Sequence, residues 1–262
     1  MRACSPTTYR IRQNGVMENI KQAPPVLLDF LRRTDTCTVS NAIETFDTRM
    51  RNEGYTQDGI RAIFPEMSAV AGYAVTGRIR TSAPPMSHRY YYQNIEWWEF
   101  VASLPGPKFV ALADVDNAPG TGAFFGEIHM QISKALGCVA YVTNGTIRDL
   151  PKIRSAGFSC FASGVRVSHA YAHLIEMGEP VEIGCLQIRT GDLLHADCHG
   201  VQKIPMEIAA SIPNAVAAIA AREAELIEVC KDPAFSMEKL TTLLRGKDQI
   251  EPAAPPGQEV DR

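Results

Sequence analysis

Apolar residues in the middle of the chain fall into blocks of two kinds. The run at 109–115 is almost continuously apolar, which is typical of a strand covered on both faces. The blocks predict strand, helix, strand, helix and strand in turn at 109–115, 124–136, 139–142, 149–156 and 158–162. Strands that alternate with single helices predict a parallel sheet with crossover connections. The pattern therefore indicates an α/β fold.

The flanking segments add helices and antiparallel strands. Pro24 and Pro25 precede the apolar run 26–31, which predicts a helix because proline is favoured at a helix start. Residues 38–43 read as a strand end or cap that leads into a second short helix. Further predictions are a strand at 72–79, a long aromatic loop at 81–95, a helix at 97–103, antiparallel strands within 180–205, and an Ala-rich terminal helix at 206–231 with a candidate break at Pro213.

No linker or internal repeat divides the chain. We expect a loose, polar N-terminal extension at 1–22, a single domain at 23–231, and a C-terminal helix and flexible tail at 232–262. Composition is that of an ordinary globular protein, since 45% of the 262 residues are hydrophobic and the net charge is −3. So small a charge indicates neither a nucleic acid nor an anionic membrane surface as a partner.

Two further features predict a cytoplasmic location. No apolar run approaches the ~20 residues that a membrane helix needs, and the N-terminus has no apolar stretch that could act as a signal peptide. The seven cysteines are widely spaced without a CxxC pair. Reduced thiols are therefore expected, and a disulfide framework or a cysteine zinc site is not.

A glycine loop follows the apolar run at 109–115 and precedes the predicted helix. Gly120, Gly122 and Gly126 approximate the GxGxxG pattern, but the third glycine is one residue late, so a dinucleotide or S-adenosylmethionine site is a weak alternative to a simple turn. A helix N-terminus also binds anions through its free N–H groups. Gly126 would allow close approach to the N–H groups of residues 127–129.

The second polar loop, at 144–149, follows the next predicted strand. Arg148 can grip a carboxylate or an oxyanion, and Asp149 can hold a hard divalent cation. Because both loops leave the same end of neighbouring parallel strands, Glu127 is expected to lie close to this pair. The alternative from the pattern alone is a surface ion pair in which Asp149 caps the following helix.

Several spaced motifs together resemble one family, the 4-hydroxy-4-methyl-2-oxoglutarate aldolases and RraA-like proteins. The likeness covers roughly 26–210. Its motifs lie at 40–42, 72–76, 125–128, 135–137, 144–149, 191–201 and 204–205. The resemblance implies an RraA-like α/β/β sandwich of swivelling-domain type, with a mixed sheet, N-terminal helices and an extra C-terminal helix. It also implies a homotrimer or hexamer with active sites between subunits.

The resemblance also implies residue roles. Asp149 is similar to the direct ligand of a divalent metal, Mg²⁺ or Mn²⁺, and Glu127 to an acid that holds metal-bound water. Arg148 resembles the residue that steadies the 2-oxo oxygen of the substrate. Ile128 and His129, next to Gly126, resemble positions whose backbone N–H groups bind the pyruvyl carboxylate. The chain departs from the family pattern at two positions, since Asn144 and Glu127 stand where many relatives carry Asp.

The implied function is a metal-dependent lyase that cleaves a 4-hydroxy-2-oxo acid and releases pyruvate through a metal-stabilised enolate. The substrate would be of the 4-hydroxy-4-methyl-2-oxoglutarate or 4-carboxy-4-hydroxy-2-oxoadipate type, with oxaloacetate decarboxylation as a further activity. A different class of function is implied as well, because some RraA-like proteins are regulators that bind a ribonuclease. A methyltransferase would need an S-adenosylmethionine loop, which the sequence does not supply.

Some charged residues have no role in this scheme. Candidates for an acid donated by a neighbouring subunit are Glu207, Glu223 and Glu225. His195, Asp197 and His199 alternate along a predicted strand with spacing that suits a metal, and a polar β corner or a subunit contact is the alternative.

Overall fold

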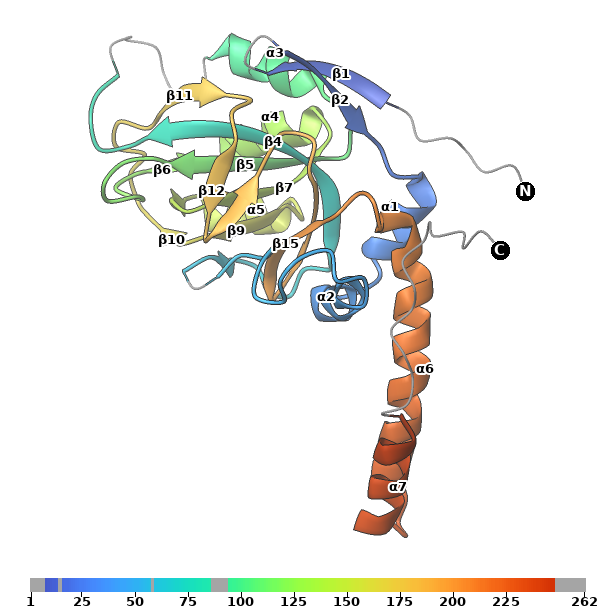
Figure 1. Ribbon diagram of the computed structural model, residues 1–262. Coiled ribbons are helices and arrows are strands. Elements are labelled where there is room, and N and C mark those ends of the chain that lie inside the picture. The colour runs from blue at the N-terminus through green and yellow to red at the C-terminus, as the bar shows by residue number, and fades with distance from the viewer. Residues whose placement is uncertain (1–7, 14–15, 58, 86–93, 248–262) are drawn as a thin grey trace.

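A mixed, nearly closed β-sheet forms the centre of the protein (Figure 1). The structure is a computed structural model, which describes residues 8–13, 16–57, 59–85 and 94–247. Along the sheet the strand order is β15 (Gly200–Ile204), β14 (Leu193–Asp197), β4 (Val70–Arg80), β5 (Lys108–Asp114), β7 (Cys138–Thr143), β9 (Ser159–Ala162) and β3 (Arg61–Ala62). An eighth strand, β11 (His173–Met177), pairs with the second half of β4.

The centre of this sheet is parallel, as the sequence predicts. β4, β5, β7 and β9 run in one direction, whereas β14 pairs antiparallel with both β4 and β15. Every residue of β5 is buried, because helices cover one face of the strand and a small hairpin covers the other. The hairpin consists of β12 (Val181–Ile183) and β13 (Leu186–Ile188), which confirms antiparallel strands in this part of the chain.

Three layers enclose two apolar cores, which confirms the α/β/β architecture. The helices on one face are α3 (Ile95–Ser103), α4 (Glu127–Ala135) and α5 (Leu150–Ser155). Side chains from the hairpin β12–β13 fill the opposite face. A third core lies beside the antiparallel strands and is built from α1 (Pro25–Leu31), α2 (Thr36–Glu44), the short 3-10 helix η2 (Ala209–Ser211) and the start of α6 (Ile212–Lys231).

One predicted helix begins later than expected. Residues 123–125 form a short strand, β6 (Ala123–Phe125), and α4 starts only at Glu127. β6 pairs with β8 (Thr146–Ile147), which in turn pairs with β10 (Gly164–Val165). The Phe125 ring stacks on Tyr141 of β7 with 4.0 Å between ring centroids, so contacts distant in sequence hold this stretch extended.

The N-terminal segment also differs from the loose lead-in that the sequence predicts. β1 (Thr8–Gln13) and β2 (Val16–Lys21) form an antiparallel pair. Asn14-Gly15, the dipeptide between them, is a strong hairpin signal in the sequence. Residues 86–93 of the predicted aromatic loop and the predicted tail from 248 onward lie outside the described residues.

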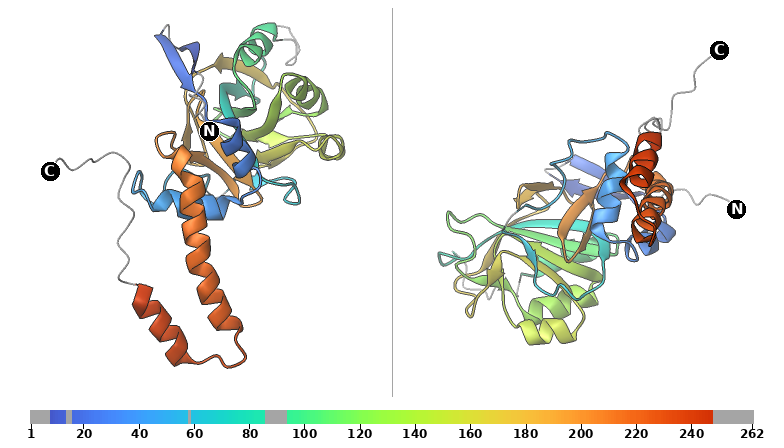
Figure 2. Two further views of the ribbon diagram at one scale, coloured as in Figure 1. Left: turned by 90° about the vertical axis from the view of Figure 1, so that its right-hand side faces the viewer. Right: turned by 90° about the horizontal axis from the view of Figure 1, so that it is seen from below.

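A helical arm extends from the domain at its C-terminal end (Figures 1 and 2). α6 packs its first turns on α2, and α7 (Met237–Lys247) folds back along its outer part. Pro213 lies in the first turn of α6, where its missing N–H is tolerated, so it begins this helix and does not break it. Among the described residues, none of the helices is long and apolar enough to cross a membrane.

Candidate active site

Two helices begin side by side at the carboxyl edge of the parallel strands. α4 starts after Gly126 and α5 starts after Asp149. The loops that precede them are held together by Asn144, whose amide oxygen accepts from the Asp114 N–H at 2.7 Å and whose amide nitrogen donates to the Asp114 carbonyl at 2.9 Å. The end of β5 is therefore fixed to the loop that follows β7.

The Asp149 carboxylate joins the two helix starts. One oxygen, Oδ2, accepts the backbone N–H of Glu127 at 3.0 Å, and Oδ1 lies 3.3 Å from Nε of Arg148. Asp149 itself has a left-handed backbone, with φ of 59°, a conformation that aspartate tolerates better than most residues. The carboxylate thus caps α4. The alternative interpretation expected Asp149 to cap its own helix, α5, but its side chain makes no capping bond there.

Gly126 is required by this close approach. A Cβ atom at position 126 would lie 2.6 Å from Oδ2 of Asp149 and 3.0 Å from Cγ of Arg148. Both distances are too short for unshifted neighbours, so a larger residue would push the carboxylate away from the start of α4.

Arg148 and Glu127 complete the cluster. The Arg148 N–H donates to the Phe125 carbonyl at 3.0 Å, which fixes the backbone under the guanidinium. The side chains of Glu127 and Asp149 are 42% and 34% exposed, so a ligand can reach both. The structure therefore brings Glu127, Arg148 and Asp149 together, as predicted. The structure adds Lys152, whose Nζ lies 3.5 Å from Oε1 of Glu127. The sequence signal that could have indicated this pair is the place of Lys152 in the first turn of the helix that follows Asp149.

Ile128 and His129 occupy the first turn of α4. The Met130 N–H makes the first bond of the helix, to the Gly126 carbonyl, so the N–H groups of Ile128 and His129 stand where a helix can receive an anion. The His129 ring is buried against Phe124, with 4.5 Å between centroids. Burial lowers the pKa of His129 to about 3, so its imidazole is neutral at pH 7 and serves as a packing residue.

The donor set of this cluster fits a hard divalent cation. Asp149 and Glu127 supply carboxylate oxygens, which Mg²⁺ and Mn²⁺ prefer, and Mg²⁺ usually keeps several water ligands beside one or two carboxylates. The Glu127 N–H donates to Oδ2 of Asp149 and the Arg148 Nε–H to Oδ1, and each oxygen has a second lone pair. The arrangement can therefore hold a cation next to a helix N-terminus and an arginine.

The predicted cluster of His195, Asp197 and His199 is only partly assembled. His195 is buried, and its Nε2 lies 2.9 Å from the Leu31 carbonyl, so its ring faces α1. Nδ1 of His199 lies 3.0 Å from Oδ1 of Asp197. The sequence interpretation did not include Cys198, which lies between these two residues and close to both. The expected alternation along one face fails because residues 198 and 199 form the turn between β14 and β15.

This three-layer core, with polar side chains gathered where parallel strands end, defines an α/β protein with a candidate ligand site at the carboxyl edge of its sheet. The sequence matches the family described as RraA-like: Aldolase/RraA over residues 36–202, and the chain belongs to that family.

One named relative is similar to part of this chain. A protein of Halalkalibacterium halodurans named "Putative 4-hydroxy-4-methyl-2-oxoglutarate aldolase" is 31% identical over 86 residues, which are 32% of this chain and 41% of that protein. The chain thus spans about two fifths of that relative's length.

Solved structures with the same fold are similar over most of the chain. An uncharacterized protein from Pseudomonas syringae pathovar tomato has a TM-score of 0.67 at 19% identity, covering 88% of this chain and 99% of that one. A Streptomyces coelicolor protein described as an unusual member of the RNase ES inhibitor RraA family has a TM-score of 0.59 at 20% identity, covering 79% and 97%.

Proposed function

We propose that this protein is a divalent-metal-dependent lyase that cleaves a 4-hydroxy-2-oxo acid and releases pyruvate. The observation that carries the proposal is the junction of the two helix starts, where Glu127, Arg148 and Asp149 meet through the 3.0 Å bond between the Asp149 carboxylate and the Glu127 N–H. The partial likeness to a named aldolase supports the same reaction class.

In this proposal each residue acts on one part of a 2-oxo acid. The N–H groups of Ile128 and His129, at the start of α4, bind the substrate carboxylate. The Arg148 guanidinium donates to the 2-oxo oxygen, where negative charge develops when the neighbouring carbon–carbon bond breaks. Asp149 would hold a Mg²⁺ or Mn²⁺ ion directly and Glu127 through water. Such an ion, when bound, adds Lewis-acid stabilisation of that same charge.

Lys152 extends the scheme. Its ammonium lies 3.5 Å from the Glu127 carboxylate, so it contacts that side chain at the start of α4. Glu127 is one methylene longer than the Asp of many relatives, and pairing with Lys152 on α5 orients the longer arm. We further propose the homotrimer or hexamer that the family resemblance implies, with sites between subunits, and a cytoplasmic location.

The test is pyruvate release from 4-hydroxy-4-methyl-2-oxoglutarate and from oxaloacetate, with Mg²⁺ or Mn²⁺ and then with EDTA. Asp149→Asn is the informative variant, because asparagine tolerates the left-handed backbone at this position but removes the ligand charge. We expect release that EDTA abolishes and that Asp149→Asn nearly abolishes. Asp29→Asn, at an exposed ion pair on α1, is the matched control. Metal-independent release, or full activity in Asp149→Asn, would contradict the proposal.

One observation favours a second candidate function, that of a protein-binding regulator. The arm carries exposed apolar side chains that a partner could cover, namely Ile227, Phe235, Met237 and Leu244. In this candidate function the partner is a ribonuclease or another protein. This second function gains support if neither substrate yields pyruvate with folded, metal-loaded protein. It also requires that the full chain inhibits a purified ribonuclease and that the double variant Phe235→Ser/Met237→Ser does not.

A further inference from the structure

Three consecutive residues, at the end of β14 and in the turn that leads to β15, present three kinds of metal-binding atom. Donor atoms of Asp197, Cys198 and His199 all lie within 4.8 Å of one another. Nδ1 of His199 is 3.0 Å from Oδ1 of Asp197 and 3.5 Å from Sγ of Cys198. A carboxylate, a thiol and an imidazole therefore face a common point.

The base of this cluster is rigid. Asp197 is buried, and the Thr36 N–H and hydroxyl at the start of α2 donate to its two oxygens at 2.8 and 2.6 Å. The His199 N–H donates to the same carboxylate at 2.9 Å, which folds the turn back over it. Gln202 binds the Thr36 carbonyl at 2.8 Å and fastens β15 to α2. Asp197 is thus held in place, whereas Cys198 and His199 are exposed and can approach a ligand.

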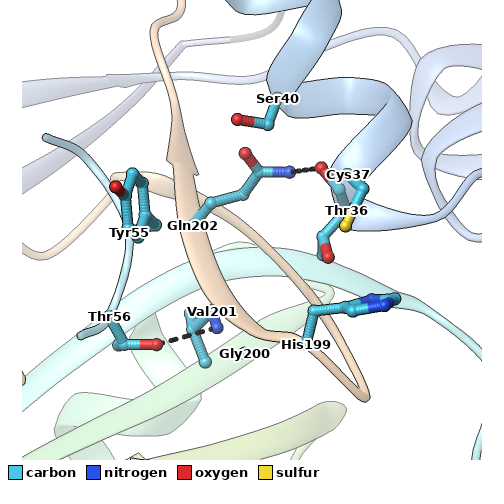
Figure 3. A pocket seen from close by; sticks show the side chains of 9 residues that line it. All are labelled: Thr36, Cys37, Ser40, Tyr55, Thr56, His199, Gly200, Val201 and Gln202. Atoms are coloured by element: carbon cyan, nitrogen blue, oxygen red, sulfur yellow. Dashed lines mark hydrogen bonds between the residues drawn. The ribbon is translucent and has the colours of Figure 1, made fainter. Parts of the chain in front are cut away.

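A cavity of about 170 Å³ opens beside the turn (Figure 3). Its lining includes His199 and a second thiol, Cys37, on the first turn of α2. Burial raises the pKa of Cys37, and the nearby acidic groups Asp197, Asp35 and Cys198 raise it further. Four groups that become anions on losing a proton therefore share this end of the molecule, an arrangement that a dication would relieve.

We propose that Asp197, Cys198 and His199 form a binding site for a borderline-soft divalent cation of the Zn²⁺ class. A mixed sulfur, nitrogen and oxygen donor set suits Zn²⁺ and is unsuited to Mg²⁺, which prefers oxygen alone. His199 would bind through Nδ1 as a neutral imidazole with its proton on Nε2, and Cys198 as thiolate, so binding releases the thiol proton. Three protein ligands leave a fourth position for water or another ligand. This site is separate from the proposed lyase site and does not depend on it.

The experiment uses the full chain, stripped of metal and kept reduced, and titrates it with Co²⁺ and then Zn²⁺ in the presence of excess Mg²⁺. Cobalt bound to a thiolate gives a sulfur-to-metal charge-transfer absorption that oxygen ligands do not give. We expect one such Co²⁺ per chain, displaced by one Zn²⁺. Cys198→Ser and His199→Ala each lower the affinity by at least about 10–100-fold, the range that even outer-shell changes cost.

Controls separate this site from other thiols and from the lyase site. Cys230→Ser, an exposed cysteine on α6, and Asp149→Asn are expected to leave the absorption and the stoichiometry unchanged. Far-ultraviolet circular dichroism checks that each variant folds, which is expected because both replaced side chains are exposed. A cobalt spectrum without the sulfur band, or one that Cys198→Ser leaves intact, would overturn the assignment.

Discussion

The two polar clusters of this protein lie at opposite edges of one sheet. β14 pairs with β4 so that Ala196, next to Asp197, stands opposite Val70, the first residue of β4. α4 and α5, in contrast, begin beyond the last residues of the parallel strands β5 and β7. One edge therefore gathers residues from two separate helix starts, and the other gathers neighbours from a single turn anchored to α2.

The comparison shows how the same sheet prepares sites of different chemistry. At the carboxyl edge the donors are oxygens beside an arginine and a helix N-terminus, a setting for an anionic substrate and a hard cation. At the edge with the β14–β15 turn, sulfur and nitrogen join one fixed carboxylate, a setting for a softer cation. Variants at one edge should leave the other edge unaffected, and this independence can be tested.

The largest expected effect is that of Arg148→Ala. Removing one donor to a developing oxyanion costs about 10²–10³ in turnover, so we expect a loss of that size in pyruvate release. Zinc-class binding at the β14–β15 turn should be unchanged. Arg154→Ala is the matched control, because that arginine lies further along α5 and pairs with Glu66 at 3.0 Å. Near-normal turnover in Arg148→Ala would remove this arginine from the mechanism.

Gly126→Ala should come next. The added methyl would lie 2.6 Å from Oδ2 of Asp149, so the carboxylate must move off the Glu127 N–H. Misplacement of about 1 Å can cost ~10² in rate, and steady-state kinetics should show a loss of that order. Gly157→Ala tests how far such changes act through the backbone, because position 157 has left-handed φ but open space around it. Equal activity losses in both variants would contradict the contact argument.

Thr36→Val probes the edge with the β14–β15 turn. The Thr36 hydroxyl donates to the charged Asp197 carboxylate at 2.6 Å, and a buried bond to a charged group contributes about 1.5–3 kcal/mol to stability. Urea unfolding should show a loss of that size, with weaker Co²⁺ binding and unchanged pyruvate release. Thr38→Val, whose hydroxyl makes an exposed bond to Asp35 on the same helix, should have a smaller effect. Equal destabilisation by the two variants would contradict a larger contribution of the buried hydrogen bond to stability.

Asp116→Asn gives the smallest expected effect and concerns the carboxyl edge. Burial alone raises the pKa of Asp116, but hydrogen bonds from the N–H and hydroxyl groups of Thr81 and Ser82 together outweigh it and lower the pKa. The charged form therefore stabilises the fold above the unfolded value near 3.9, and this stabilisation is lost as the pH falls through the lower folded value. Acid unfolding should be less steep in Asp116→Asn, and Asp47→Asn, at an exposed position, is the matched control.

The sequence predicts the parallel core because its signals are local. The apolar run of β5 and the proline start of α1 need only their own residues. β6 was missed because its extended form depends on pairing with β8 and on the stacking of Phe125 on Tyr141. The N-terminal pair β1–β2 was missed, although the dipeptide Asn14-Gly15 in the sequence is typical of a hairpin.

The candidate site shows the same division. Family motifs and topology predict that Glu127, Arg148 and Asp149 meet, and the geometry agrees. No local pattern shows that Asp149 caps α4 across 22 positions of sequence, since this depends on how two loops pack. Likewise Cys198 reads as an ordinary thiol until the turn folds it against His199.

The arm gives the protein the mechanics of a lever. α6 is attached along its first turns and then continues outward, so its 20 residues reach roughly 30 Å. A tilt of about 10° at Ile212 would move the far end by about 5 Å, a displacement close to one helical turn. A pair of spectroscopic labels, one on the domain and one near Lys231, would therefore magnify small changes in the third core into distances that are readily measured.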